Sequence, residues 1–437
     1  MNQAGRVLIA IILIVGIIGV LVTGAVMYTR LVLAGVLIIG ISWAWTYSSL
    51  YGIKVSRSAR SLKASVGDVL EENFEVTNQT LIPRLWLEVA NETPLPSASG
   101  SRLVTMLNGH QRRFYLARTW LVKRGAFALG PTVLRAGDPF GLFKTKREIP
   151  AAKSIIVLPM ILPIAEFPSP PGLLPGGKAI RRKSMDVTPH ASGVREYATG
   201  DPIKRIHWAS TARRGRLMVK EFEQDPQAQV WLILDTQAGI HFENPHTQNV
   251  DWLDGVIFRR KPTIEIFPST LEYSVTIAAS LAHYYINKRK AVGLVSAGQV
   301  LTVISAERSD RQENKILETL AFVDDSGKVS LAGVVEAQAK FLPIGSSVIL
   351  ITPSVRQEVL LAVGELQRRN LHPLVILMMV DSFGGPRGSE KLVQSLLELN
   401  VPVCQVICGE DLSKTISAFA AQHITEELRT WQKPLYT

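Results

Sequence analysis

Residues 7–27, VLIAIILIVGIIGVLVTGAVM, contain no charged side chain, and a second uncharged run over residues 31–50 follows after a three-residue turn. At about 1.5 Å per residue, a helix over either run is about 30 Å long, which matches the hydrocarbon core of a bilayer. A cleaved signal peptide is the competing interpretation, but its apolar region has only about 7–15 residues and no second span follows it. The pattern therefore predicts a transmembrane helical hairpin over residues 1–53.

The charges that flank the hairpin predict its orientation. Residues 54–63 contain four basic side chains and no acidic one, whereas the turn between the two runs carries only Arg30. Positively charged flanks remain on the cytoplasmic side of a membrane. We therefore expect a multi-pass protein of the cell membrane with two spans and with the bulk of the chain in the cytoplasm.

The composition indicates a multidomain protein of a reducing compartment. The chain has 437 residues, of which 47% are hydrophobic, and this suffices for two or three folded domains. Cys404 and Cys408 are the two cysteines, which excludes a secreted scaffold built on disulfides. If both lie on one strand, they are about 13 Å apart and cannot form a bridge. We expect two free thiols.

The region after the hairpin has the pattern of a β-rich domain. Short apolar runs in residues 54–150 are interrupted by turn residues such as Gly67-Asp68 and Gly130-Pro131. Strands at intervals of about 8–12 residues are typical of a small antiparallel sandwich. No cluster of catalytic residue types occurs here, which favours a spacer or an interaction module. Residues 151–177 are rich in proline and glycine, and we expect them to form a linker.

Residues 229–437 have the pattern of an α/β domain. Apolar runs, which we expect to be buried strands, alternate with amphipathic helical patterns, and the runs cover residues 230–235, 291–298, 346–353, 374–381 and 401–408. Strands that are apolar on both faces and separated by helices predict a mostly parallel sheet covered on both sides. The expected fold is two transmembrane helices, a sandwich-like middle domain and a doubly wound α/β domain.

Residues 178–228 form an unusually basic segment. Between Lys178 and Lys220 there are eleven lysine or arginine residues and three acidic ones. Asp201-Pro202 is a typical helix start, so we expect a helix over residues 202–214 with Asp201 as its N-cap. A solvated charged face would explain the composition; an acidic protein surface, lipid headgroups or nucleic acid would explain it as a binding surface. No nucleic-acid recognition module is present, and we expect no nucleic acid partner.

Within this segment, the stretch GVREYATGDPIKRIHWASTARRGRLMVKEFE contains a set of residues at fixed spacing. This set resembles the signature of domain-of-unknown-function family 58, and the whole order of regions is similar to that family. The resemblance implies a von Willebrand factor A-like fold for the last domain and assigns partner binding to the signature. The residues that carry it are Arg195, Tyr197, Gly200, Asp201, Arg205, Ile206, Trp208, Ala212 and Arg213, of which all but Ala212 are expected to bind the partner.

The same resemblance implies partners and a metal site. Members of the family usually accompany a MoxR-type AAA+ ATPase, and often a transglutaminase-like membrane protein. Von Willebrand A domains often bind magnesium through Asp-x-Ser-x-Ser with a distant threonine and aspartate, since a hard cation needs oxygen ligands. Here Asp235 is present, Gln237 and Gly239 replace the serines, and Thr270 would stand for the threonine. The run at residues 346–353 ends in Thr352-Pro353 and is followed by Ser354, with no aspartate where the distant carboxylate is expected. We therefore expect a degenerate site at Asp235, with no metal and no cofactor.

These observations lead to one main hypothesis and two alternatives. The main hypothesis is a non-enzymatic, membrane-anchored cytoplasmic adaptor that partners the ATPase in protein assembly or maturation. The first alternative is a hydrolase that uses Asp201, His207 and Asp235. The second is binding of an anionic lipid or polymer through residues 178–220, which would weaken steeply with salt.

Overall fold

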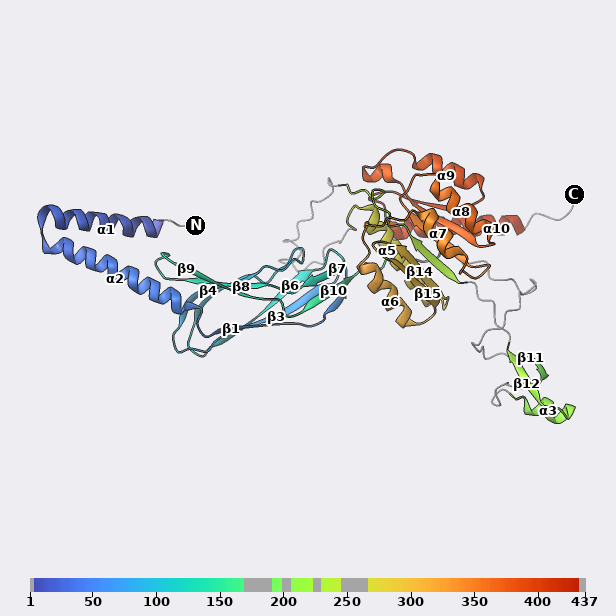
Figure 1. Ribbon diagram of the computed structural model, residues 1–437, viewed down its shortest axis with the longest axis horizontal. Coiled ribbons are helices and arrows are strands. Elements are labelled where there is room, and N and C mark those ends of the chain that lie inside the picture. Colours follow the sequence, from blue (N-terminus) through green and yellow to red (C-terminus); the bar gives the residue numbers. More distant parts are fainter. Residues whose placement is uncertain (1–3, 169–190, 199–205, 223–228, 245–265, 432–437) are drawn as a thin grey trace. The chain divides into compact units, whose positions relative to one another are not determined.

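The computed structural model describes residues 4–168, 191–198, 206–222, 229–244 and 266–431 (Figure 1). Contacts divide the chain into two compact units, one built mainly from residues up to Met160 and the other mainly from Ile161 onward. The first unit contains a helical hairpin and a β-sandwich, and the second contains an α/β domain and the signature residues. Each unit is therefore described separately.

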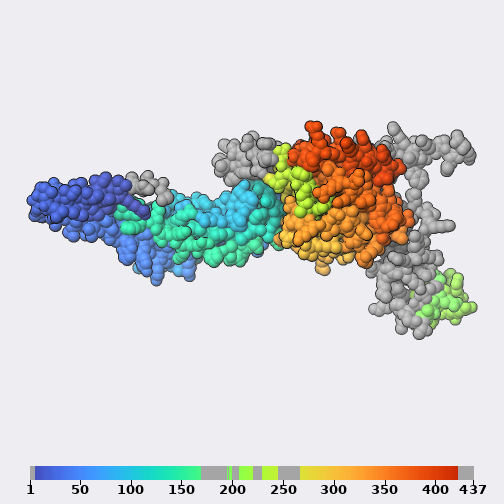
Figure 2. All heavy atoms as spheres, turned by 45° about the horizontal axis from the view of Figure 1, so that its top comes forward, coloured from blue at the N-terminus to red at the C-terminus, as the bar shows by residue number. Residues whose placement is uncertain are grey.

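Two antiparallel helices, α1 (Ala4–Thr23) and α2 (Val26–Ser49), begin the chain. Both are long and apolar enough to cross a membrane, and almost all of their side chains lie on the surface (Figure 2). Glycines line the contact between them, since a Cβ on Gly16 or Gly35 would lie 2.7 Å from the side chain of Val32 or Leu13, respectively. Small residues of this kind are typical of membrane helix pairs.

Two sheets face each other in the middle domain and form the expected sandwich. The first sheet contains β1 (Ile53–Ala59), β3 (Val69–Asn78) and β6 (Arg112–Trp120), all antiparallel. The second contains β5 (Arg102–Leu107), β4 (Arg84–Asn91), β8 (Thr132–Gly137) and β9 (Lys144–Ile149), also antiparallel. Strand alternation places Phe74, Leu87 and Leu134, each 0% exposed, in the core between the sheets.

A third, smaller sheet extends the sandwich. It consists of β2 (Lys63–Ser65), β10 (Ser154–Leu158) and β7 (Gly125–Ala128), in which β10 is parallel to β2 and antiparallel to β7. Ile155 and Val157 of β10 are fully buried with Leu121. The β-unit therefore extends beyond the expected boundary at residue 150, because two apolar residues of the supposed linker complete a small core.

One charged pair lies inside the sandwich. Arg57 of β1 donates hydrogen bonds from Nε and Nη2 to the two carboxylate oxygens of Glu72, at 2.6 and 2.8 Å. The Glu72 side chain is 1% exposed and that of Arg57 is 11% exposed. Arg57 also donates to Asn91 and lies over the ring of Phe74. The charges of Arg57 and Glu72 thus neutralise each other. The sequence predicts Arg57 only as part of an exposed basic flank.

The second unit is organised around a six-stranded sheet, as the alternating pattern predicts. Its order is β15-β14-β13-β16-β17-β18, and all neighbours are parallel except β14 and β15. The strands are β13 (Val230–Leu234), β14 (Val292–Ala297), β15 (Leu301–Glu307), β16 (Ser347–Thr352), β17 (His372–Met378) and β18 (Val403–Val406). Every residue of β13 is buried, so both faces of the sheet are covered at its centre.

Helices connect and cover these strands. A hydrophobic cluster joins Ile233 and Leu350 of the sheet to Val335, Val363 and Leu396 of three helices. The helices are α5 (Thr270–Asn287), α6 (Asp310–Ala321), α7 (Leu331–Ala339), α8 (Glu358–Arg368), the 3-10 helix η3 (Val380–Phe383), α9 (Ser389–Glu398) and α10 (Leu412–Trp431). The architecture is an α/β domain with a mostly parallel sheet.

The two cysteines are free thiols, as expected. Cys404 lies on β18 and is 1% exposed, and burial raises the pKa of its thiol to about 12. Cys408 is half-buried two residues after the strand ends. Cys404 therefore behaves as a small apolar core residue and is not reactive near neutral pH.

Candidate functional site

The carboxyl edge of the central strands carries a buried aspartate. Asp235 follows β13 directly, is 3% exposed, and receives the hydroxyl hydrogen bond of Thr352 on Oδ2 at 2.6 Å. The backbone N–H of Gln237 donates to Oδ1 at 3.3 Å. Asp235 and Thr352 end two adjacent parallel strands, whose carboxyl ends meet at the same edge. This is the place in an open α/β sheet where ligands usually bind.

Burial has the largest effect on the pKa of the Asp235 carboxyl group. It raises the pKa of Asp235 to about 6, against the opposing effect of the hydrogen bonds from Thr352 and Gln237. Glu358 raises the pKa further through its negative charge, and Arg356 lowers it. A carboxyl group with such a pKa changes charge close to neutral pH.

Thr270 and His241 form a polar network beside Asp235. The Nε2 of His241 donates to the backbone carbonyl of Asp235 at 3.1 Å, because that oxygen can only accept. Its Nδ1 lies 3.1 Å from the hydroxyl of Thr270, and the oxygen of that hydroxyl accepts from the N–H of Phe242 at 3.0 Å. The Thr270 hydroxyl is therefore engaged with its own neighbours, and its contacts do not reach the Asp235 carboxylate.

The network leaves two buried oxygens without a hydrogen-bond partner among the described residues. They are the Thr236 hydroxyl oxygen and Oε2 of Glu358. Glu358, at the start of α8, is a second carboxylate that acts on Asp235, and sequence reasoning missed it. The described residues nevertheless contain no group of three His, Cys, Asp or Glu side chains suited to a metal ion. A degenerate site at Asp235 therefore stays a prediction.

Gly327 closes the same edge between the ends of β13 and β14. Its N–H donates to the Thr236 carbonyl at 2.9 Å, and its own carbonyl accepts from the N–H of Ala238 at 2.7 Å. A Cβ added to Gly327 would lie 2.6 Å from the Thr236 carbonyl oxygen and closer still to that of Ala297. Only glycine permits this approach of three backbone segments.

Replacing Gly327 by alanine should therefore destabilise the α/β domain by about 1–3 kcal/mol, because the clash is with backbone atoms that cannot rotate away. The melting temperature of the purified chain measures the change. Gly364→Ala is the matched control, since nothing lies within 4 Å of its added Cβ on α8. That variant should be neutral or slightly more stable. Equal melting temperatures for both variants would contradict the close packing at Gly327.

The signature residues within the described part form a small separate structure. β11 (Ala191–Glu196) pairs antiparallel with β12 (Met218–Phe222), and Ile206 bridges to Val219. The short helix α3 (Trp208–Arg214) ends at Gly215, whose φ of 65° is the left-handed conformation that glycine favours. Ile206, Met218 and Val219 are buried and hold the element together.

The expected helix over residues 202–214 is wrong at its start. The N–H of His207 donates to the Met218 carbonyl at 2.7 Å, so the backbone at residues 206–207 is bridged to β12 instead of coiled. His207 is the N-cap, and its Nδ1 accepts from the N–H of Ser210 at 3.2 Å. A local cap signal at Asp201 thus did not determine the helix start, because pairing with β12 did. Asp201 itself lies outside the described residues.

The structure brings together some of the predicted site residues and not others. Arg195 lies on β11, Tyr197 follows it, and the Tyr197 N–H donates to the Leu217 carbonyl at 2.8 Å. Gly200 and Arg205 lie outside the described residues, as does Asp201. His207 and Asp235, the two described residues of the hydrolase alternative, each have local partners of their own, Ser210 and Thr352 respectively.

α3 presents an aromatic and basic surface. Trp208 is 66% exposed and Leu217 is 46% exposed, while Arg213 and Arg214 in the last turn are exposed as well. Arg216 forms an exposed ion pair with Glu196 at 2.7 Å. We call Trp208, Arg213, Arg214 and Leu217 the α3 surface.

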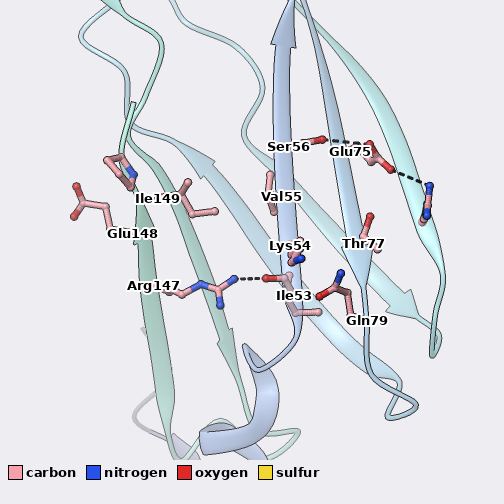
Figure 3. Close-up of a pocket in the computed structure, with 12 residues that line it drawn as sticks. Ile53, Lys54, Val55, Ser56, Glu75, Thr77, Gln79, Arg147, Glu148 and Ile149 are labelled. Carbon is pink, nitrogen blue, oxygen red and sulfur yellow. Dashed lines mark hydrogen bonds and ion pairs between the residues drawn. The ribbon is translucent and has the colours of Figure 1, made fainter. Parts of the chain in front are cut away.

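A groove of about 610 Å³ lies in the first unit, between the edge strands β1 and β9 (Figure 3). Ile53, Val55 and Ile149 line its apolar part, and Lys54, Glu75 and Glu148 its polar part. Arg147 closes one end by donating to the carbonyl oxygen of Ile53. The groove has no cluster of groups suited to catalysis among these residues.

Two comparisons with known proteins match this chain, one in the region of the signature and one over a longer stretch. Residues 193–254 match the family model described as "Protein of unknown function DUF58". The chain is 22% identical over 285 residues to "Uncharacterized protein YeaD" of Bacillus subtilis (strain 168). That match covers 62% of this chain, and the chain spans 63% of the length of the relative. Both matches support the similarity to the DUF58 family.

The similarity to solved structures is weak. The pilus adhesin SpaC of Lactobacillus rhamnosus GG matches with a TM-score of 0.30 and 9% identity, over 47% of this chain and 31% of that one. A GH20 exo-β-N-acetylglucosaminidase of Vibrio harveyi matches with a TM-score of 0.17 and 8% identity, over 86% and 71% of the chains. These scores are too low to carry an argument about fold or function.

Proposed function

We propose that this chain is a membrane-anchored cytoplasmic adaptor of the DUF58 family, and that its α3 surface binds a MoxR-type AAA+ ATPase. The observation that carries this proposal is the exposure of Trp208 on a helix within the residues that match the family model. The adaptor would act in the assembly or maturation of other proteins, with a transglutaminase-like membrane protein as a further partner.

The α3 surface has the composition of a protein contact. Tryptophan and arginine are the residues most enriched at the energetic centres of protein interfaces. A tryptophan that is 66% exposed leaves a large apolar area in water, which association with a partner would remove. The buried residues Ile206, Met218 and Val219 hold this helix in place, so the surface is formed before binding.

The helical hairpin supports the membrane anchor. α1 and α2 have the length and composition of spans, and in a soluble protein their exposed leucine, isoleucine and valine side chains would face water. The basic flank at residues 54–63 supports a cytoplasmic sandwich, and Arg57 is its member that lies largely buried, bound to Glu72. Lys54, Arg60 and Lys63 are the other basic residues of the flank, and Arg60 and Lys63 form more exposed ion pairs with Glu71 and Glu318.

A non-catalytic role agrees with the local functions of the candidate residues. His207 caps α3, and Asp235 accepts from Thr352, so both have structural roles that need no reaction. We propose no cofactor. The hydrolase alternative predicts an activity that is lost on replacement of Asp235 or His207 while partner binding survives.

Affinity purification of the full chain from native membranes, solubilised mildly, tests the proposal. We expect a stoichiometric AAA+ ATPase to co-purify with the wild type and to be lost from a Trp208→Ala, Arg213→Glu variant. The loss follows because the variant removes the aromatic centre and reverses one charge of the α3 surface. Mass spectrometry of the eluate measures the ratio of the two proteins.

A matched control is available in the α/β domain. Phe341 is 71% exposed with the Lys340 ammonium 5.0 Å from its ring, and a Phe341→Ala, Lys340→Glu variant should retain the ATPase. If the Trp208→Ala, Arg213→Glu variant retained the ATPase, the ATPase would not bind at the α3 surface. Absence of any ATPase from the wild type, with other complexes intact, would refute the adaptor proposal and favour the lipid and hydrolase alternatives.

A further inference from the structure

Three loops of the sandwich gather at the end where α2 enters it. β3 ends at Asn78, opposite Ile53, and the following loop covers residues 79–83. β5 ends at Leu107, opposite Arg84, and the next loop covers residues 108–111. β8 runs antiparallel to β4, so the loop at residues 138–143 lies at this end as well. We call these three loops the α2-end loops.

The junction between α2 and the sandwich is closely packed. Leu50, the residue after α2, is 7% exposed and belongs to the sandwich core. Arg84 donates to the Tyr51 carbonyl at 3.0 Å, and Arg147 donates to the Leu50 carbonyl at 3.1 Å. Two guanidinium groups thus satisfy carbonyls at the negative end of the helix dipole. The N–H of Gln79 donates to the Gly52 carbonyl at 2.8 Å, which fixes the first loop against the same junction.

The loop at residues 138–143 also contacts the start of α1. Arg6 donates from Nε to the Leu142 carbonyl at 2.7 Å. The loop has its own internal support, because the buried Asp138 carboxylate accepts from the N–H groups of Phe140 at 2.9 Å and Phe143 at 2.6 Å. Phe140 is 55% exposed on this supported loop. It is therefore held outward beside the ends of both helices.

The α2-end loops combine exposed apolar tips with a basic surround. Leu81 is 81% exposed and Ile82 is 47% exposed, in addition to Phe140. Lys54, Lys144 and Lys146 are exposed on the adjoining strand ends, and Arg112 is 68% exposed. The acidic residue in these loops is Asp138, which is buried and bound to backbone N–H groups. Apolar tips with a mostly basic surround, in which Arg112 lies 3.8 Å from the Glu75 carboxylate, fit an anionic lipid surface.

We propose that the α2-end loops enter the headgroup region of the bilayer, with Leu81, Ile82 and Phe140 in the apolar boundary and the lysines near anionic lipid headgroups. The inference rests on the proposed membrane anchor, since the hairpin brings the loops to the bilayer surface. The bilayer is favoured over a protein partner because these loops contact both the start of α1, through Arg6 and Leu142, and the segment that follows α2, through Gln79 and Gly52. The sandwich is then held at the membrane at several points besides α2.

Fluorescence quenching of the full chain in nanodiscs tests this surface. A bimane label is placed on Phe140→Cys in a Cys408→Ala background, where Cys404 is 1% exposed and unreactive. The nanodiscs contain phosphatidylcholine and phosphatidylglycerol, with a lipid that carries a shallow nitroxide. We expect loss of most of the bimane emission to the nitroxide lipid and protection from iodide in the water. The loss should weaken without phosphatidylglycerol and in a Lys144→Glu, Lys146→Glu variant.

Phe114→Cys provides the matched control. Phe114 is an aromatic residue that is 68% exposed on β6, three register positions from the α2 end. Its label should be quenched by iodide and not by the lipid. Equal quenching of the two labels would overturn the inference. A label at Phe140→Cys that is protected from iodide but not quenched by the lipid would also overturn it, and would indicate a protein partner. Release of the wild-type chain by alkaline carbonate would instead refute the anchor itself.

Discussion

Replacing Arg57 by methionine should lower the free energy of unfolding of the β-sandwich by about 3–5 kcal/mol, because the change leaves the Glu72 carboxylate buried without its partner. Methionine keeps most of the apolar volume of the arginine stem, so the loss reports mainly on the charge. Pulse proteolysis of the detergent-solubilised chain in increasing urea measures this free energy. This is the largest effect that we expect from one substitution in the sandwich.

The expected loss in the free energy of unfolding is large because the Arg57–Glu72 pair is deeply buried. The Glu72 side chain is 1% exposed and receives both charged hydrogen bonds from Arg57, at 2.6 and 2.8 Å. With 1% of its side chain exposed, the carboxylate has little access to water that could replace these bonds once the guanidinium is gone. The double variant Arg57→Met, Glu72→Leu should recover most of the loss, since an apolar pair of similar volume costs little or nothing in such a place.

An exposed pair in the same sheet serves as the control. Arg60 and Glu71 lie 3.6 Å apart, and the arginine side chain is 84% exposed. Arg60→Met should change the free energy of unfolding by less than about 1 kcal/mol, because water already screens this pair. If the two arginine variants lost equal stability, or if the double variant were no better than Arg57→Met, the buried pair would not have the role assigned to it.

The stability of the α/β domain should fall as the pH rises from about 4 to about 6. Burial raises the pKa of the Asp235 carboxyl group from 3.8 to about 6, so the folded state holds a proton that the unfolded state has released. Stability is therefore fully present below the unfolded pKa and is lost as the pH passes through the folded one. A shift of this size corresponds to about 3 kcal/mol. Melting temperatures across this range measure it.

Asp235→Asn should abolish this dependence. The neutral side chain has the same shape and keeps an oxygen that can accept from Thr352, so the variant should match the wild type near pH 4 and exceed it at pH 8. Thr352→Val is the complementary variant. It removes a hydrogen bond that favours the carboxylate, so its loss of stability should continue to higher pH. A wild-type curve that is flat between pH 4 and 6 would contradict the raised pKa.

The same titration tests the degenerate metal site. A bound divalent cation would neutralise the Asp235 carboxylate and restore the stability lost at pH 8. We expect magnesium chloride to leave the melting temperatures of the wild type and of Asp235→Asn equally unaffected, once ionic strength is matched. A rise confined to the wild type would show that Asp235, with Glu358 near it, still binds a cation.

The elements of the α/β domain that the sequence predicts are the ones with strong burial. The apolar runs at residues 230–235 and 346–353 correspond to β13 and β16, since a strand covered on both faces has no polar side. β15 was not predicted because it is an edge strand with mostly exposed side chains. α7 was missed as well, because it is short and lacks a polar face at helical spacing.

The candidate site was only partly predictable because its contacts are distant in sequence. Asp235 follows from the strand pattern, but its hydrogen bond to Thr352 joins residues 117 positions apart. Glu358 belongs to a helix whose place at the sheet edge only the fold determines. The same reason explains Arg57, which sequence reasoning treats as a flank of the membrane span and which the sandwich pairs with Glu72.

The junction at Leu50 also has a mechanical consequence. Between Ser49, where α2 ends, and Ile53, where β1 begins, the backbone carbonyls are bound by Arg84 and Arg147, and Leu50 is packed in the core. The connection between α2 and β1 therefore contains no loosely held residues that could absorb rotation or extension. A force on β1 is therefore transmitted directly to α2. We expect the sandwich to tilt together with that helix.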